Sequence, residues 1–82
     1  MKRRTRVKIV TRKLGRERAY GLQEPGLLQI DSRLTGKRRL TILIHESLHE
    51  VFPGMSEYQV TRTAPKLASI LWQDRWRQVT KL

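Results

Sequence analysis

The sequence predicts an α+β fold, in which a short antiparallel β-sheet of about three strands precedes two antiparallel helices. Apolar and polar residues alternate over the first third of the chain, as they do in strands with one solvated face. From about Lys37 onward, apolar residues recur at helical spacing, and Pro53-Gly54 divides this stretch in two. The 82 residues leave room for one domain with one modest core, which we expect to span residues 1–82.

The strands are expected within the first 30 residues. Residues 1–18 form a basic N-terminal region, and the imperfect alternation over 6–14 predicts the first strand there. Residues 19–30 predict a hairpin, with strands over 19–23 and 27–30. Pro25-Gly26 between them suits the two central positions of a type II turn.

Two helices are expected in the rest of the chain, over residues 37–52 and 56–77. The second opens with the capping-box pair Ser56 and Gln59. Pro65 within it predicts a kink or two helical pieces. Apolar residues at helical spacing predict the buried sides of both helices, Leu40, Ile44, Leu48 and Val51 on the first and Val60, Ala64, Leu67, Ala68 and Leu71 on the second.

The first helix contains the pattern H-E-x-x-H, from His45 to His49. Residues four apart on a helix project from the same side, so both imidazoles can reach one metal ion. Glu46 lies beside the first histidine, where its carboxylate can take a proton from a water molecule activated by that ion. These are the only two histidines of the chain. The alternative is that both are solvated residues of an ordinary helix.

The charges on this helix oppose its dipole. Basic residues crowd its positive end at 37–39, whereas Glu46 and Glu50 lie toward its negative end and repel each other. Each misplaced charge costs about a few tenths of a kcal/mol. A bound dication near Glu46 would offset this cost, which favours a metal site.

A catalytic zinc typically takes three protein ligands and a water. Because the chain has no third histidine and no cysteine, the third ligand must be a carboxylate, from Glu17, Glu24, Asp31, Glu50, Glu57 or Asp74. A short loop that folds the second helix back antiparallel brings Glu57, in its first turn, near His49. Glu57 is therefore the preferred third ligand and Asp31 the fallback. A glutamate in a first turn also complements the helix dipole without any metal.

Residues 30–72, through their H-E-x-x-H segment, resemble the zincin metallopeptidases, and most closely the gluzincin type among small single-domain zincin-like proteins. In gluzincins a glutamate on a following helix completes the metal site. The resemblance implies that His45 and His49 bind zinc. Glu57, the preferred third ligand, lies earlier on its helix than the corresponding glutamate of many gluzincins. The resemblance also implies that Glu46 is the general base in the hydrolysis of a peptide bond.

The same resemblance implies how a substrate binds. In zincins an extended peptide pairs with an edge strand beside the active-site helix, and we expect Leu27 to Ile30 to be that edge. Stabilising the transition state needs a further hydrogen-bond donor. Tyr20, Tyr58 and Arg62 are candidates, and the sequence assigns the role to none of them.

The net charge is +11, with 18 lysines and arginines against 7 acidic residues. Half of the basic residues fall within the first 18 positions, namely Lys2, Arg3, Arg4, Arg6, Lys8, Arg12, Lys13, Arg16 and Arg18. A field of this sign attracts polyanions such as nucleic acid, for which Lys2, Arg3, Arg4 and Arg6 are the candidate contacts. A solubilising surface without a partner explains the same charge.

Three functions therefore stay open. The first is a zinc peptidase acting on a peptide or protein substrate, and the second is a basic nucleic-acid-binding protein. The third is an inactive zincin fold with a structural metal. The chain has no cysteine, and it shows neither the apolar segment of a signal peptide nor a stretch long enough to span a membrane. We expect a cytoplasmic protein without membrane contact, and the sequence does not indicate its oligomeric state.

Overall fold

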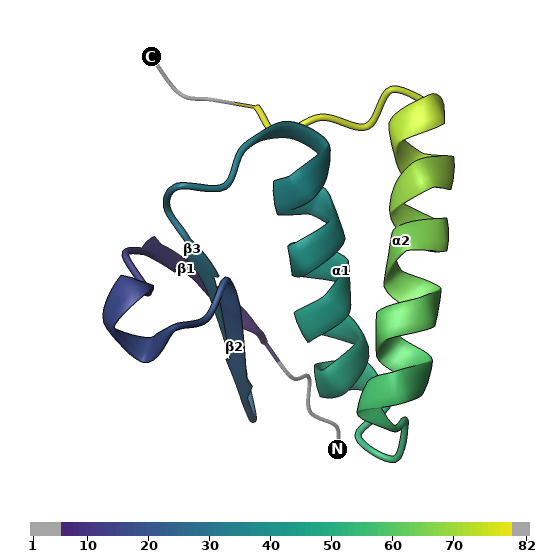
Figure 1. Cartoon of the computed structure of the whole chain (residues 1–82). Helices are drawn as coiled ribbons and strands as arrows, with labels where there is room; N and C mark the ends of the chain where they lie inside the picture. Colours follow the sequence, from purple (N-terminus) through teal and green to yellow (C-terminus); the bar gives the residue numbers. More distant parts are fainter. Residues whose placement is uncertain (1–5, 80–82) are drawn as a thin grey trace.

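A computed structural model describes residues 6–79. Its elements follow one another in the order β1 (Lys8–Arg12), the 3₁₀ turn η1 (Gly15–Glu17), β2 (Gly21–Glu24), β3 (Leu27–Asp31), α1 (Gly36–Val51) and α2 (Glu57–Gln73) (Figure 1). The predicted α+β fold is confirmed. α1 lies between the sheet and α2 and packs against both, so the helix that carries H-E-x-x-H is the middle layer of the molecule. No helix within residues 6–79 is long and apolar enough to cross a membrane.

The sheet is mixed rather than antiparallel. β3 is its middle strand, pairing antiparallel with β2 and parallel with β1. The hairpin of β2 and β3 is thus confirmed, whereas the prediction of a purely antiparallel sheet is wrong. So is the prediction that residues 27–30 form an edge, because β1 and β2 are the edge strands.

The connection between β1 and β2 explains this topology. Residues 13–20 carry the chain past the end of β3, from the edge formed by β1 to the opposite edge, which β2 forms. The backbone N–H of Asp31 donates to the carbonyl of Tyr20 at 2.8 Å, and that of Ser32 donates to the carbonyl of Arg12 at 3.0 Å. Leu14, in this connection, is fully buried and anchors it. β3 is therefore inserted between two strands that both precede it in the sequence.

The starts of the two helices lie within one residue of the predicted positions. α1 begins at Gly36. α2 begins with the predicted capping box, in which the N–H of Gln59 donates to Oγ of Ser56 at 3.1 Å and the N–H of Ser56 donates to Oε1 of Gln59 at 3.0 Å. α2 continues through Pro65, so the expected division into two pieces is not seen. Buried residues on both sides of Pro65 hold the two halves against α1, which outweighs the lost backbone hydrogen bond.

α2 ends at Gln73 rather than at the predicted residue 77. Arg75 adopts the left-handed conformation, with φ of 70°. Its N–H donates to the carbonyl of Trp72 at 3.0 Å, and the N–H of Trp76 donates to the carbonyl of Leu71 at 3.0 Å. These two bonds form a Schellman motif, which stops the helix. Glycine usually occupies the left-handed position, and its absence hid the helix end from the sequence prediction.

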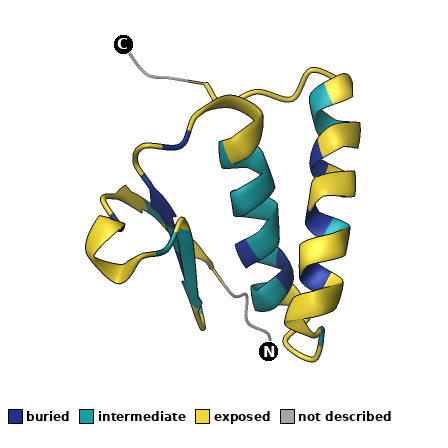
Figure 2. Cartoon of the chain, viewed as in Figure 1, coloured by how far each residue is buried: buried dark blue, intermediate teal, exposed yellow. Residues whose placement is uncertain are grey.

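The buried residues lie on the middle strand, in the connections and on the helices (Figure 2). The apolar ones are Leu14, Leu28, Ile30, Leu34, Leu48, Val60, Ala64 and Ala68. The predicted core positions Val51 and Leu67 are exposed by 63% and 38%. Val51 is the last residue of α1, directly before the loop to α2, and its burial was wrongly predicted.

Candidate metal centre

Three side chains of the types that can bind a metal ion converge from two helices at one end of the helical hairpin. The Nε2 atom of His45 lies 3.2 Å from Oε2 of Glu57, and the Nε2 atom of His49 lies 2.7 Å from Oε1 of Glu57. One donor atom from each of the three residues lies within 4.8 Å of the other two. The structure therefore brings together the histidines and the carboxylate that the sequence analysis preferred.

This geometry fits a metal ion. Zinc binds nitrogen and oxygen at about 2.0–2.2 Å, which places neighbouring ligand atoms of a tetrahedral site roughly 3.3 Å apart. The separations of 2.7 and 3.2 Å between the imidazole nitrogens and the oxygens of Glu57 need only small adjustments to reach that value. Two imidazoles and a carboxylate are a donor set that zinc and other transition metals accept. The group of His45, His49 and Glu57 could thus hold a metal ion.

The loop between the helices fixes the position of Glu57. The N–H of Phe52 donates to the carbonyl of Leu48 at 2.8 Å, and the N–H of Met55 donates to the carbonyl of Phe52 at 2.9 Å. Met55 also packs against the apolar cluster between the helices, which lies next to the histidines on α1. The capping box then starts α2, so that Glu57 is its first residue. The position of the Glu57 side chain thus depends on a loop whose shape is set by hydrogen bonds and by packing.

The carboxylate of Glu57 contacts both imidazoles and one hydroxyl group. Thr61, one turn later, donates its hydroxyl to Oε2 of Glu57 at 3.4 Å. Partial desolvation raises the pKa of Glu57, but the hydrogen bond to His49 and the attraction of both imidazoles outweigh it and lower that pKa. The side chains of His45 and His49 are exposed by 18% and 24%, and that of Glu57 by 69%. The centre is therefore open to solvent on one side.

Glu46 faces a different neighbour. Its side chain is only 8% exposed, and this burial raises its pKa. It lies against Gly21 of β2, where a Cβ atom would come within 2.8 Å of Oε2 and 2.9 Å of Cγ of Glu46, and within 2.7 Å of Cγ2 of Ile42. Gly21 thus leaves the space that Glu46 and Ile42 fill. The sequence analysis missed Gly21, although a glycine at a strand often marks such a close approach.

Glu50 lies on α1 and binds the hairpin formed by β2 and β3. Gln23 donates its side-chain amide to Oε1 of Glu50 at 2.8 Å, and the backbone N–H of Gly26 donates to both carboxylate oxygens at 3.1 Å. Gly26 has φ of +80°, as the third position of a type II turn requires. These bonds explain why a carboxylate stands one turn from Glu46 despite the repulsion. Glu50 keeps β2 beside the H-E-x-x-H helix, a role that the sequence analysis missed.

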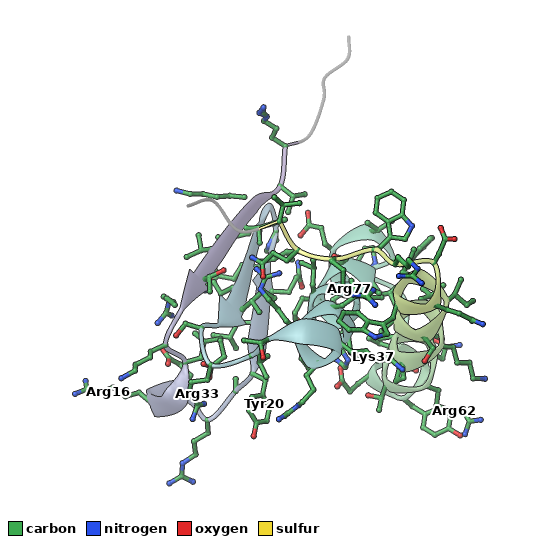
Figure 3. All side chains as sticks on the ribbon, turned by 90° about the horizontal axis from the view of Figure 1, so that it is seen from above. Arg16, Tyr20, Arg33, Lys37, Arg62 and Arg77 are labelled. Carbon is green, nitrogen blue, oxygen red and sulfur yellow. The ribbon has the colours of Figure 1, made fainter. Side chains whose placement is uncertain are left out.

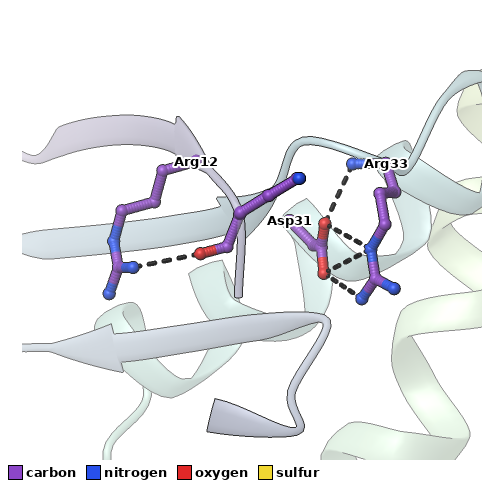
Figure 4. A network of polar contacts seen from close by, with 4 residues as sticks. Arg12, Asp31 and Arg33 are labelled. Atoms are coloured by element: carbon purple, nitrogen blue, oxygen red, sulfur yellow. Dashed lines mark hydrogen bonds and ion pairs between the residues drawn. The ribbon is translucent and has the colours of Figure 1, made fainter. Parts of the chain in front are cut away.

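Asp31, the fallback ligand, serves a different purpose. It is fully buried at the end of β3, where Arg33 donates its backbone N–H to Oδ1 at 2.9 Å and its Nε–H at 3.0 Å (Figure 4). The hydrogen bonds of Arg33 lower the pKa of Asp31 to about 2. Asp31 does not belong to the donor group found among residues 6–79. Its carboxylate holds the link between β3 and α1.

The other candidates lie apart from the three donors or outside the described chain. Glu17 pairs with Arg12 at 3.2 Å, and Tyr58 accepts a hydrogen bond from Arg62 at 3.2 Å. Within the described part of the chain, no hydrogen bond joins Tyr20, Tyr58 or Arg62 to the donor group. Of the candidate nucleic-acid contacts, Arg6 is exposed, and the remaining ones, Lys2, Arg3 and Arg4, lie outside the described residues.

No protein-family model, no curated protein and no solved structure matches this chain. Membership of the zincins therefore stays a prediction from the H-E-x-x-H segment. What supports a function is the placement of the side chains themselves.

Proposed function

We propose that this protein is a zinc-dependent metallopeptidase, with His45, His49 and Glu57 as zinc ligands and Glu46 as general base. One observation carries the proposal. Three donors converge on one point, while Glu46, between two of them in sequence, is turned toward β2 and buried there. A structural metal site needs only the ligands, whereas a desolvated carboxylate beside them suits proton transfer.

The donor set also favours catalysis over a structural role. Structural zinc sites are usually closed by four protein ligands, whereas catalytic sites keep one position for water or substrate. Among residues 6–79 the donor group has three members, and its solvent-exposed side leaves room for a substrate. When bound, a zinc ion supplies a Lewis acid that polarises the scissile carbonyl and makes the attacking water more acidic.

Glu46 moves the proton in this proposal. Burial raises its pKa, which makes its carboxylate a better proton acceptor near neutral pH than an exposed glutamate. It takes a proton from the attacking water and delivers it to the nitrogen of the leaving amine. The proton stays shielded meanwhile, because the side chain lies between α1 and the backbone of β2.

β2 is the strand that suits an extended substrate. It is an edge of the sheet, and its first residue borders Glu46. A peptide that adds to this edge through backbone hydrogen bonds brings its carbonyl groups past the side of α1 that carries the donors. β2 therefore replaces residues 27–30 as the proposed substrate-pairing strand.

The test compares zinc-loaded wild type with Glu46→Gln on a pool of internally quenched peptides. Glu46→Gln keeps the shape of the side chain and removes the base, so we expect zinc to stay bound and kcat to fall by a factor of about 10² to 10⁴. Asp74→Asn is the control, because Asp74 is an exposed carboxylate at the C-terminal end of α2, outside the donor group and outside β2. Equal cleavage by wild type and Glu46→Gln would exclude Glu46 as the base. An inactive zinc-loaded wild type would refute the peptidase.

A further inference from the structure

An aromatic ring flanked by two cations lies on the surface near the start of β2. The Cζ atom of Arg38 is 5.2 Å and that of Arg33 is 6.0 Å from the centre of the Tyr20 ring, within the range of cation–π attraction. Tyr20 is 50% exposed, and Figure 3 shows Tyr20 and Arg33 projecting outward from the molecule. Tyr20, Arg33 and Arg38 are called the Tyr20 cluster below.

The Tyr20 cluster has an unbalanced positive charge. The guanidinium of Arg33 is paired with the carboxylate of Asp31. Arg38 has no carboxylate within ion-pair distance among residues 6–79. The cation–π contact with Tyr20 instead holds its side chain in place, which reduces the entropy that a binding partner would otherwise have to overcome.

The Tyr20 cluster lies at one end of a row of side chains on α1 that reaches the candidate metal donors. Arg38, Ile42, His45 and His49 recur at i, i+4, i+7 and i+11, so they follow one side of α1. Tyr20 directly precedes Gly21, whose backbone borders Ile42 and Glu46. His45 lies seven positions after Arg38, which corresponds to about 10 Å along the helix and to roughly three residues of an extended peptide.

We propose that the Tyr20 cluster binds an acidic side chain of the peptide substrate, about three residues from the bond that is cleaved. The inference rests on the proposed peptidase function and names the class of its substrates. The guanidinium of Arg38 can donate two parallel hydrogen bonds to one carboxylate. The net charge of +11 attracts acidic peptides to the protein before they dock.

Nucleic acid fits the same cluster less well. A phosphate backbone needs several unpaired cations in a row, and single-stranded binding needs a series of exposed rings. The cluster offers one ring and one arginine without a carboxylate partner, beside the row of side chains that reaches the candidate metal donors. One ring and one arginine are enough to bind a single acidic residue of a peptide whose backbone already pairs with β2.

Binding is measured first, with zinc-loaded Glu46→Gln, so that no turnover is required. The probes are three fluorescein-labelled peptides of one alanine-leucine-glycine background, carrying glutamate, glutamine or lysine at the varied positions. By fluorescence anisotropy we expect the glutamate peptide to bind about tenfold more tightly than the glutamine peptide, and the lysine peptide most weakly. In the Glu46→Gln background, a second substitution Arg38→Gln should make the three peptides bind equally. Arg38→Glu should reverse the order of their affinities. Lys66→Gln, an exposed lysine on α2, leaves it unchanged.

Cleavage by the wild type separates this inference from the function on which it rests. Arg38→Gln should raise KM for glutamate-containing peptides about tenfold and leave kcat unchanged. Cleavage without any preference for glutamate overturns the substrate preference alone. Absence of all cleavage by the zinc-loaded wild type refutes the peptidase and this inference with it. A labelled single-stranded DNA that binds more tightly than the glutamate peptide, and loses affinity in Arg38→Gln, assigns the cluster to nucleic acid and also overturns the proposal.

Discussion

The two ends of the helical hairpin differ in chemistry although the same pair of helices forms both. The end of α1 and the start of α2 bring together two imidazoles and a carboxylate. The start of α1 and the end of α2 border an open groove of about 640 Å³, whose lining is mostly apolar. Leu40, Leu43, Leu71, Trp72 and Trp76 line this apolar groove. The guanidinium of Arg77 stacks on Trp72 at 3.4 Å and holds the tail across it.

This difference indicates that one end of the helical hairpin contributes mainly to stability and the other mainly to metal binding. The half-buried side chains around the apolar groove, Leu40, Leu43, Leu71 and Trp72, supply burial that stabilises this end of the helical hairpin. At the polar end, burial and the dipole of α1 both disfavour the charge of Glu46, and a cation bound beside it would offset that cost. We therefore expect changes at the apolar end to act on stability and changes at the polar end to act on metal binding and chemistry.

The largest expected effect is that of the metal on stability. An ion that binds the folded chain at a thousand times its Kd stabilises it by about 4 kcal/mol. For a domain of this size, that corresponds to a rise in melting temperature of roughly 15 °C or more. Calorimetry with zinc and with excess chelator measures the difference, and His45→Ala is the control in which it should vanish. Identical melting curves in both conditions would show that the polar end does not use a metal.

Next in size is truncation at the apolar end. Trp72→Ala removes a half-buried ring from the groove and should lower the free energy of unfolding by about 2 kcal/mol, measured by urea denaturation. Its zinc affinity in the folded state should stay within about twofold of wild type, because the donors lie at the other end. A large loss of zinc affinity in folded Trp72→Ala would mean that the two ends are coupled, against the division proposed here.

Gly21→Ala tests the contact between β2 and Glu46. The added methyl group would lie less than 3 Å from Glu46 and Ile42, so both side chains must shift. We expect a loss of about 1–3 kcal/mol in stability from overpacking. We also expect a fall in kcat greater than the fall in zinc affinity, since Glu46 moves more than the ligands. Gly15→Ala, where a Cβ meets no atom within 4 Å, is the control. Unchanged kcat in Gly21→Ala would place the base elsewhere.

The smallest effect concerns acid stability and belongs to neither end. The folded pKa of Asp31, about 2, lies below its ordinary value of 3.8. The ionised carboxylate therefore stabilises the fold above pH 3.8, and this contribution disappears as the pH falls from 3.8 to 2. Urea denaturation across this range should show wild type losing stability more steeply than Asp31→Asn. Parallel curves for the two proteins would mean that Arg33 does not hold this carboxylate.

The sequence predicted well whatever depends on neighbours along the chain. The helical spacing of His45 and His49, the capping box and the short loop before Glu57 are all local, so the donor group could be anticipated. Pairing between strands is not local: nothing in residues 13–20 reveals that they cross the end of β3. For the same reason the contact between Gly21 and Glu46 and the bonds of Glu50 to the hairpin turn could be seen only once the layers were assembled.

The measurement that tests the metal centre most directly is zinc stoichiometry and affinity by isothermal titration of metal-free protein. Wild type and Glu24→Ala, which removes an exposed carboxylate of β2, should each bind one zinc ion per chain. His45→Ala should lose the site, and Glu57→Ala should bind at least about tenfold more weakly. Absence of zinc binding by the wild type, or retention of full affinity in His45→Ala, would contradict the metal centre proposed here.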